Sequence, residues 1–164
     1  MAISDVYTYK SGSVAIATTS TTPVISVYGT AAKRLWVVGV RVEIGVTAAA
    51  AGNSILFQLA RPALTTVNGS SLASGNPHDY SSPASIGQFS TTWTTAPTLG
   101  TVLAEWELPQ TTGSMWEEFP PLGYEWGVPA VANNAGAAGI GVHLFVTASV
   151  STSTPVFVDI IASE

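Results

Sequence analysis

The sequence predicts an all-β protein built as an antiparallel β-sandwich or barrel, and a jelly roll of about eight strands is the most economical form. Segments rich in β-branched and aromatic residues recur along the whole chain. Clusters of Gly, Asn, Ser and Pro, which favour turns, separate these segments. No segment of helical periodicity stands between them, so the alternating strands and helices of a parallel sheet are not expected.

The expected strands follow one another in chain order with short polar interruptions. The most regular spans residues 34–46, where Trp36, Val38, Val40, Val42 and Ile44 would form one apolar face and Leu35, Val37, Gly39, Arg41 and Glu43 the other. The other expected strands are 13–17 (SVAIA), 24–28 (VISVY), 54–61 (SILFQLAR), 101–108 (TVLAEWEL), 124–128 (YEWGV), 141–150 (GVHLFVTASV) and 155–161 (PVFVDII). Turns are expected at 51–53, 68–71, 74–77 and 133–136, where Gly and Asn allow the chain to reverse.

The domain organisation is expected to be simple, because 164 residues suit one domain and 46% of them are hydrophobic. Residues 1–12 are interpreted as an N-terminal arm or a first edge segment, and residues 13–164 as a single β-sandwich domain. A long loop region, residues 62–100, interrupts this domain. Long loops within a domain usually serve binding or assembly, although a floppy Ser/Thr-rich loop is the plainer alternative.

The charge content excludes several classes of partner. Charged residues make up 9% of the chain, against about 25% in typical domains, and the net charge is −5. The five basic residues are dispersed, so no basic patch for direct nucleic-acid binding is expected; they are Lys10, Lys33, Arg34, Arg41 and Arg61. No apolar run is long enough to span a membrane, and the first ten residues do not resemble a secretory signal. A soluble protein without membrane contact is expected.

Candidate catalytic and metal-binding groups are few, and each has a structural alternative. His78 and Asp79 could join Ser81 or Ser82 in a hydrolytic arrangement, but an Asx-type turn explains the same residues. Glu105 and Glu107 share a strand face, as a glycosidase pair would, yet such carboxylates more often face solvent. His143 fits a structural strand histidine, and Glu117, Glu118 and Glu125 lack the spacing of a calcium loop. Neither a catalytic residue nor a cofactor nor a metal site is therefore expected.

Four of the five tryptophans, Trp93, Trp106, Trp116 and Trp126, lie in the second half of the chain, where they could fill a core or anchor an interface. Residues 115–121 (MWEEFPP) mix large apolar groups with acids and prolines, which suits an edge or loop that contacts a partner. The candidate protein-interface residues are Tyr7, Tyr9, His78, Asp79, Tyr80, Trp93, Met115, Trp116 and Phe119.

The order of several segments resembles small virion proteins of tailed bacteriophages, over roughly residues 7 to 164. These segments are 33–42 (KRLWVVGVRV), 57–62 (FQLARP), 77–79 (PHD), 93–100 (WTTAPTLG) and 158–164 (VDIIASE). The resemblance implies a head decoration (cement) or minor capsid protein with a β-sandwich or jelly-roll core. It also implies a homotrimer, made in the host cytoplasm, that binds the major capsid protein on the outer surface of the virion. Tyr7 and Tyr9 would then belong to an arm laid on the capsid or on a neighbouring subunit.

Two other functions remain open at this point. A tail or fibre-associated jelly-roll module could bind carbohydrate or another receptor through the aromatic loops around Trp93 and Trp116. A hydrolase of the cell envelope could use Glu105, Glu107 or His78. The scarcity of titratable groups favours a non-enzymatic structural protein over an enzyme, since catalysis relies on tuned pairs of such groups.

Overall fold

The computed structural model describes residues 5–16, 23–29, 34–45, 54–62, 68–69, 72–85, 87–95, 99–109, 113–118, 127–128, 139–146 and 154–164. Every regular element in these ranges is a strand, and the pairings between strands are antiparallel. The predicted all-β class with antiparallel sheets is confirmed. The described residues contain no helix that could cross a bilayer.

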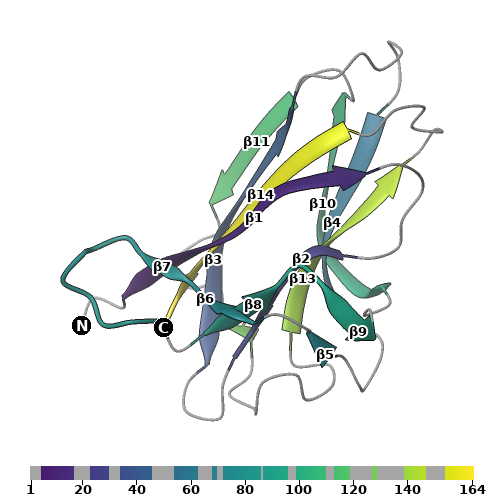
Figure 1. Cartoon of the computed structure of the whole chain (residues 1–164). Coiled ribbons are helices and arrows are strands. Elements are labelled where there is room, and N and C mark those ends of the chain that lie inside the picture. The colour runs from purple at the N-terminus through teal and green to yellow at the C-terminus, as the bar shows by residue number, and fades with distance from the viewer. Residues whose placement is uncertain are drawn as a thin grey trace.

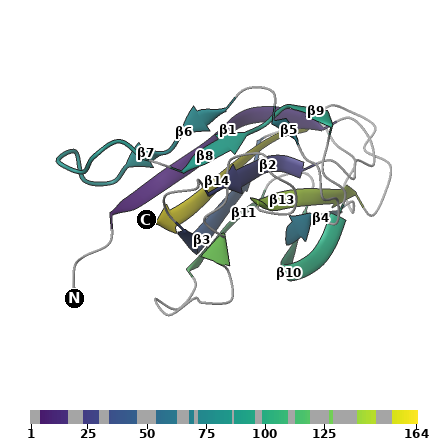
Figure 2. The same cartoon turned by 90° about the horizontal axis from the view of Figure 1, so that it is seen from below.

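Two sheets make up most of the protein (Figures 1 and 2). The first, sheet A, has the order β11-β3-β14-β1-β7, and β12 also pairs with β3. Its strands are β1 (Val6–Ile16), β3 (Leu35–Ile44), β7 (Asn76–Pro77), β11 (Gly113–Glu118), β12 (Gly127–Val128) and β14 (Thr154–Ser163).

The second, sheet B, has the order β10-β4-β13-β2-β8-β6. Its strands are β2 (Pro23–Tyr28), β4 (Ser54–Pro62), β6 (Ala73–Ser74), β8 (Gln88–Ser90), β10 (Leu99–Pro109) and β13 (Gly139–Val146). A separate two-stranded sheet joins β5 (Asn68–Gly69) to β9 (Trp93–Thr95).

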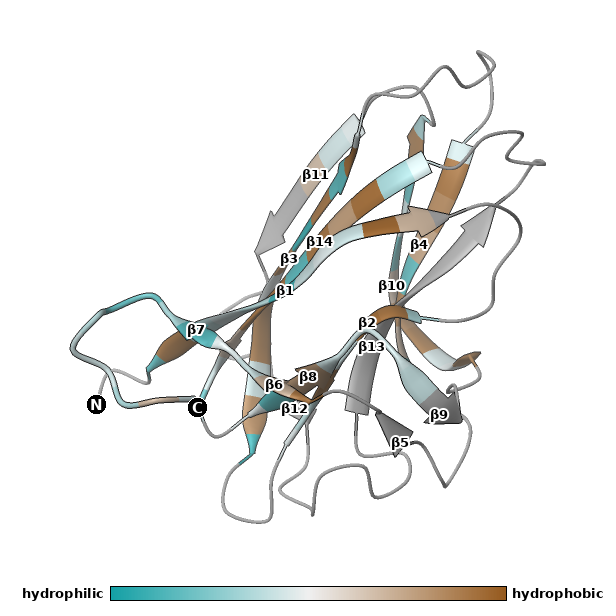
Figure 3. Cartoon of the chain, viewed as in Figure 1, coloured by the Kyte–Doolittle hydropathy of each residue, from teal (hydrophilic) through white to brown (hydrophobic). Residues whose placement is uncertain are grey.

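Both sheets contribute side chains to one hydrophobic core. Sheet A supplies residues from β1, β3 and β14, and sheet B supplies residues from β2 and β4, whose apolar positions are coloured brown in Figure 3. Phe57 and Ile160, one from each sheet, are both fully buried. Complete burial of each such side chain contributes about 1.5–3 kcal/mol, so the core is the main source of stability.

The alternation of β3 reverses near its middle, which corrects the predicted faces of this strand. Leu35 and Val37 are buried in the first half, whereas Val40 and Val42 are buried in the second. The register with β14 shifts at the same place. Gly39 lies opposite Ile161, but Val37, two residues earlier in β3, lies opposite the next residue of β14. One extra residue in β3 forms a bulge, and a bulge exchanges the two faces of a strand.

The N-terminal segment, interpreted from the sequence as an arm or a first edge segment, belongs to strand β1 of sheet A from Val6 onward. The strand β1 runs across the proposed boundary between residues 12 and 13 and pairs with β14 along its length. It meets β7 only at Tyr7 and Thr8, so the rest of its outer side lies at the sheet edge. Tyr7 and Tyr9 are 1% and 0% exposed. Tyr7 and Tyr9 are two residues apart on β1, so their side chains lie on the same face of the strand. That face packs against the hydrophobic core.

A bulge interrupts the pairing of β1 with β14 and protects this edge. The register shifts between Lys10 and Ser13, and Gly12 adopts a φ of 66° that favours glycine. The Ser11 hydroxyl accepts a hydrogen bond from the Val158 backbone N–H at 2.9 Å. An edge strand with a bulge and a lysine resists pairing with other chains.

The region 62–100 contains more regular structure than the sequence predicts. Five short strands, β5 to β9, lie within it, and β7 extends sheet A while β6 and β8 extend sheet B. Two- and three-residue strands carry too little periodic pattern to be read from sequence. Of the segment 115–121, expected to be an edge or loop, residues 115–118 belong to β11 at the edge of sheet A, and residues 119–121 lie outside the described residues.

Candidate interaction loop

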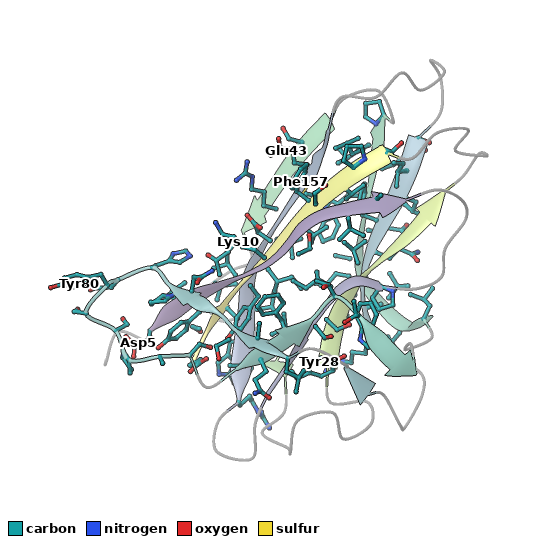
Figure 4. The ribbon with its side chains drawn as sticks, in the orientation of Figure 1. Asp5, Lys10, Tyr28, Glu43, Tyr80 and Phe157 are labelled. Carbon is teal, nitrogen blue, oxygen red and sulfur yellow. The ribbon has the colours of Figure 1, made fainter. Side chains whose placement is uncertain are left out.

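Residues 78–85, here named the Tyr80 loop, connect β7 to the segment leading into β8 and project beyond the two sheets (Figure 1). Tyr80 lies at its tip and is 97% exposed (Figure 4). A tyrosine exposed to this degree is the clearest departure from the burial pattern of the described residues, because large aromatic side chains are usually at least half buried.

A local turn shapes the tip of the loop. The Asp79 Oδ1 atom accepts hydrogen bonds from the Ser81 backbone N–H at 2.9 Å and from the Ser81 hydroxyl at 2.8 Å. The Ser82 backbone N–H also donates to the Asp79 carbonyl at 3.0 Å. The bonds from Ser81 lower the pKa of the Asp79 carboxyl because they stabilise its ionised form. The predicted Asx-type turn is confirmed.

The first strand holds the beginning of the loop. The His78 backbone N–H donates to the Val6 carbonyl at 2.9 Å, and its ring Nε2 lies 2.5 Å from the Thr8 hydroxyl. Both partners belong to β1, which is itself paired with β14. The first residue of the loop, His78, is therefore held to the sheet by two hydrogen bonds with β1.

A second set of bonds holds the end of the loop. The buried Tyr7 hydroxyl donates to the Pro83 carbonyl at 2.9 Å, and the Ser82 hydroxyl donates to Asp5 Oδ1 at 2.7 Å. A hollow of about 390 Å³ lies between Asp5, Val6 and the loop. With both ends attached, Tyr80 is presented on a short and well-supported turn.

Glu164 fastens the loop to the C-terminal strand. Its Oε1 atom accepts hydrogen bonds from the Tyr9 hydroxyl at 3.1 Å, the Ser85 hydroxyl at 2.5 Å and the Gly87 backbone N–H at 2.8 Å. The Tyr9 and Ser85 hydroxyls lie 2.9 Å apart. Burial, together with the charge of Glu164, raises the pKa of Tyr9. We name these four residues the Glu164 clasp.

The Ser–His–Asp arrangement considered from the sequence is not assembled. The Ser81 hydroxyl donates to Asp79 and the Ser82 hydroxyl donates to Asp5, whereas the His78 ring contacts Thr8. A nucleophilic serine would need a histidine nitrogen as its hydrogen-bond partner. These residues instead build a turn and attach it to β1.

The carboxylates of β10 are engaged in cross-strand contacts with β4. Glu105 accepts a hydrogen bond from Gln58 Nε2 at 3.1 Å, and Glu107 accepts one from the Ser54 hydroxyl. Both glutamates are exposed, as expected from their position on a solvent-facing strand. Within the described ranges, no three His, Asp or Glu side chains are grouped to hold a metal ion.

The predicted interface residues divide into separate groups. His78, Asp79 and Tyr80 come together in the Tyr80 loop, whereas Tyr7 and Tyr9 lie in the core beneath it. The other predicted residues lie away from the loop. Trp93 is half-buried, and its Nε1 atom donates a hydrogen bond to the Tyr28 hydroxyl at 2.9 Å. Met115 packs against the core, Trp116 pairs with Arg41 in the strand register, and Phe119 is outside the described residues.

Sequence reasoning missed the residues that secure the loop from below. Ser85 and Gly87 lie 79 and 77 residues from Glu164 in the chain. No motif or local spacing connects residues at such distances.

Comparison with protein-family models, with curated proteins and with solved structures finds no match to this chain.

Proposed function

We propose that this is a non-enzymatic structural protein that assembles with other proteins, and that the Tyr80 loop is its main contact. The single observation behind this proposal is the 97% exposure of Tyr80 on a loop attached at both ends. Tyrosine offers a large contact area with few rotatable bonds and is common at interaction hot spots. A loop that is already ordered loses little entropy on binding, so it suits this role.

The proposed partners follow from the resemblance to phage virion proteins. The protein would act as a homotrimeric decoration or cement protein on the outside of a phage head, bound to the major capsid protein. A chain in which only 9% of the residues are charged fits this role, because a surface rich in Ser, Thr and Ala side chains loses less solvation free energy when covered than a charged one. Binding in many copies would raise the effective affinity of each contact.

The proposal includes a jelly-roll fold, which the nested strand pairing supports. The eight longest described strands are β1, β2, β3, β4, β10, β11, β13 and β14. Among them the first pairs with the last, the second with the seventh, the third with the sixth and the fourth with the fifth. This is the pattern of a long hairpin rolled into two sheets, as in double Greek-key sandwiches.

The decisive experiment is co-sedimentation of the purified protein with capsids that lack it, with its native mass measured in parallel. We expect saturable binding by a trimer and at least about 30-fold weaker binding for Tyr80→Ala, which corresponds to a hot-spot loss of about 2 kcal/mol. The thermal midpoint should not change, because the Tyr80 side chain is exposed.

The matched control is Val102→Ala, which removes an apolar side chain that is 38% exposed on β10 and should leave capsid binding unchanged. Absence of binding by the wild-type protein would reject the capsid partner. Full binding by Tyr80→Ala would reject the Tyr80 loop as the contact.

A further inference from the structure

The outer face of sheet A carries a shallow hollow of about 270 Å³ that lies apart from the Tyr80 loop. Its lining residues are Lys10, Gly12, Arg41, Glu43, Phe157 and Asp159. Figure 4 shows Lys10, Phe157 and Glu43 along this side of β1, β14 and β3.

Strand register explains why these side chains share one face. Asp159 on β14 lies between Lys10 on β1 and Arg41 on β3, and Phe157 on β14 lies opposite Glu43. Directly opposed residues of an antiparallel sheet face the same side. The bulge at Gly12 leaves open space above β1, since a Cβ atom added at this glycine would meet nothing within 4 Å.

The charges in the hollow balance one another. The Arg41 guanidinium lies 2.8 Å from Glu43 and 3.9 Å from Asp159. Lys10 makes no ion pair within the described part of the chain but lies opposite Asp159. Two cations and two carboxylates sum to zero, so an ionic ligand would gain little attraction and would compete with existing pairs.

Phe157 adds an apolar surface beside these polar groups. It is 37% exposed, and the other large apolar side chains exposed in the described ranges, Tyr80 and Val102, are on other surfaces. The face of an aromatic ring carries partial negative charge and attracts polarised C–H groups laid against it. The hollow therefore combines a partly exposed aromatic side chain with charged donors and acceptors.

We propose that this hollow binds a neutral saccharide of one or two rings. Sugar hydroxyls both donate and accept hydrogen bonds, whereas Lys and Arg only donate and ionised Asp and Glu only accept. Alternating cations and carboxylates therefore suit a polyhydroxylated ligand, and the apolar C–H face of a sugar ring can stack on Phe157. The volume lies just below the range that holds drug-sized ligands, which fits one or two sugar rings.

The test is an NMR titration of isotope-labelled protein with lactose, maltose and N,N′-diacetylchitobiose, and with N-acetylneuraminic acid as an anionic probe. We expect one of the neutral disaccharides to shift the amide signals of Lys10, Gly12 and Phe157, with little dependence on salt. Concentrations should reach about tenfold above a Kd of about 1 mM.

Substitutions of Phe157 distinguish stacking from nonspecific effects. Phe157→Ala and Phe157→Leu should both weaken binding by about tenfold, whereas Phe157→Trp should retain it. The control Val102→Ala removes an apolar side chain of similar exposure and should bind normally.

Three results would overturn the proposal. They are the absence of shifts with all three neutral sugars, binding of the anionic sugar alone with loss at high salt, and equal binding by Phe157→Leu and the wild type. The outcome is independent of capsid binding, because the hollow and the Tyr80 loop share no residue.

Discussion

Removing the Tyr9 hydroxyl tests whether the Glu164 clasp stabilises the fold. In Tyr9→Phe the ring stays in the core, where it meets Phe89 edge to face with centroids 6.0 Å apart. The substitution removes only the bonds of the hydroxyl with Glu164 Oε1 and the Ser85 hydroxyl. Any loss of stability in Tyr9→Phe should therefore come from the lost hydrogen bonds of the Glu164 clasp and not from a cavity in the core.

The expected loss is about 2 kcal/mol of unfolding free energy. A hydrogen bond to a charged group contributes about 1.5–3 kcal/mol. Glu164 keeps its bonds from Ser85 and the Gly87 N–H, so its carboxylate is not left unpaired, and the loss falls in the lower part of that range. For a domain of this size the thermal midpoint should fall by about 4–8 °C.

The assay is urea unfolding followed by circular dichroism, at neutral pH and again above pH 10. The matched control is Tyr28→Phe, because the partners of this buried hydroxyl among the described residues, Trp93 and Ser26, are neutral, so its loss should be about 1 kcal/mol. A loss for Tyr9→Phe no larger than that for Tyr28→Phe would refute the clasp.

The pH dependence gives a second check on the same residue. Burial of the Tyr9 hydroxyl is the main cause that raises its pKa above the ordinary value of 10.0, and the negative charge of Glu164 raises this pKa further. The stabilisation is therefore present below pH 10 and is lost as the pH rises further, because the unfolded chain ionises first. The stability difference between the wild type and Tyr9→Phe should shrink above pH 10.

Two other predictions concern packing and charge. In Gly87→Ala the new Cβ atom would lie 2.7 Å from Leu35 Cδ1 and closer still to the Tyr9 hydroxyl. We therefore expect the free energy of unfolding, measured with urea, to fall by about 1–3 kcal/mol. An unchanged urea midpoint would contradict this close packing around Gly87. Burial raises the pKa of Asp159 despite Lys10 and Arg41, so any stability linked to its protonation is present below about pH 4 and lost at neutral pH. Asp159→Asn should therefore be slightly more stable than the wild type at pH 7 but not at pH 3.5, and a less stable variant at pH 7 would show that the attraction to Arg41 dominates.

Much of the secondary structure could be predicted because alternation and turn residues act locally. The expected strand at 54–61 agrees with β4 (Ser54–Pro62), and the expected strand at 155–161 lies within β14 (Thr154–Ser163). The turn at Asp79 was predictable for the same reason, since its carboxylate bonds a residue two positions away.

Burial and site geometry could not be read in the same way. In the sequence one face of β3, from Trp36 to Ile44, is apolar without a break, yet the bulge opposite Ile161 exchanges the two faces of the strand. Tyr7 and Tyr9 have the pattern of an exposed arm as well as that of a buried strand, and only their pairing with β14 decides between the two.

The sequence by itself determined the all-β class, the positions of strands such as β4 and β14, and the Asx-type turn, because each depends on residues that are neighbours in the chain. Only the tertiary structure decided which tyrosine is exposed, since Tyr80 stands out and Tyr9 is enclosed by Ser85 and Glu164. Tyr9 and Glu164 are 155 residues apart. Contacts at that separation depend on strand register and sheet packing, which no local pattern encodes.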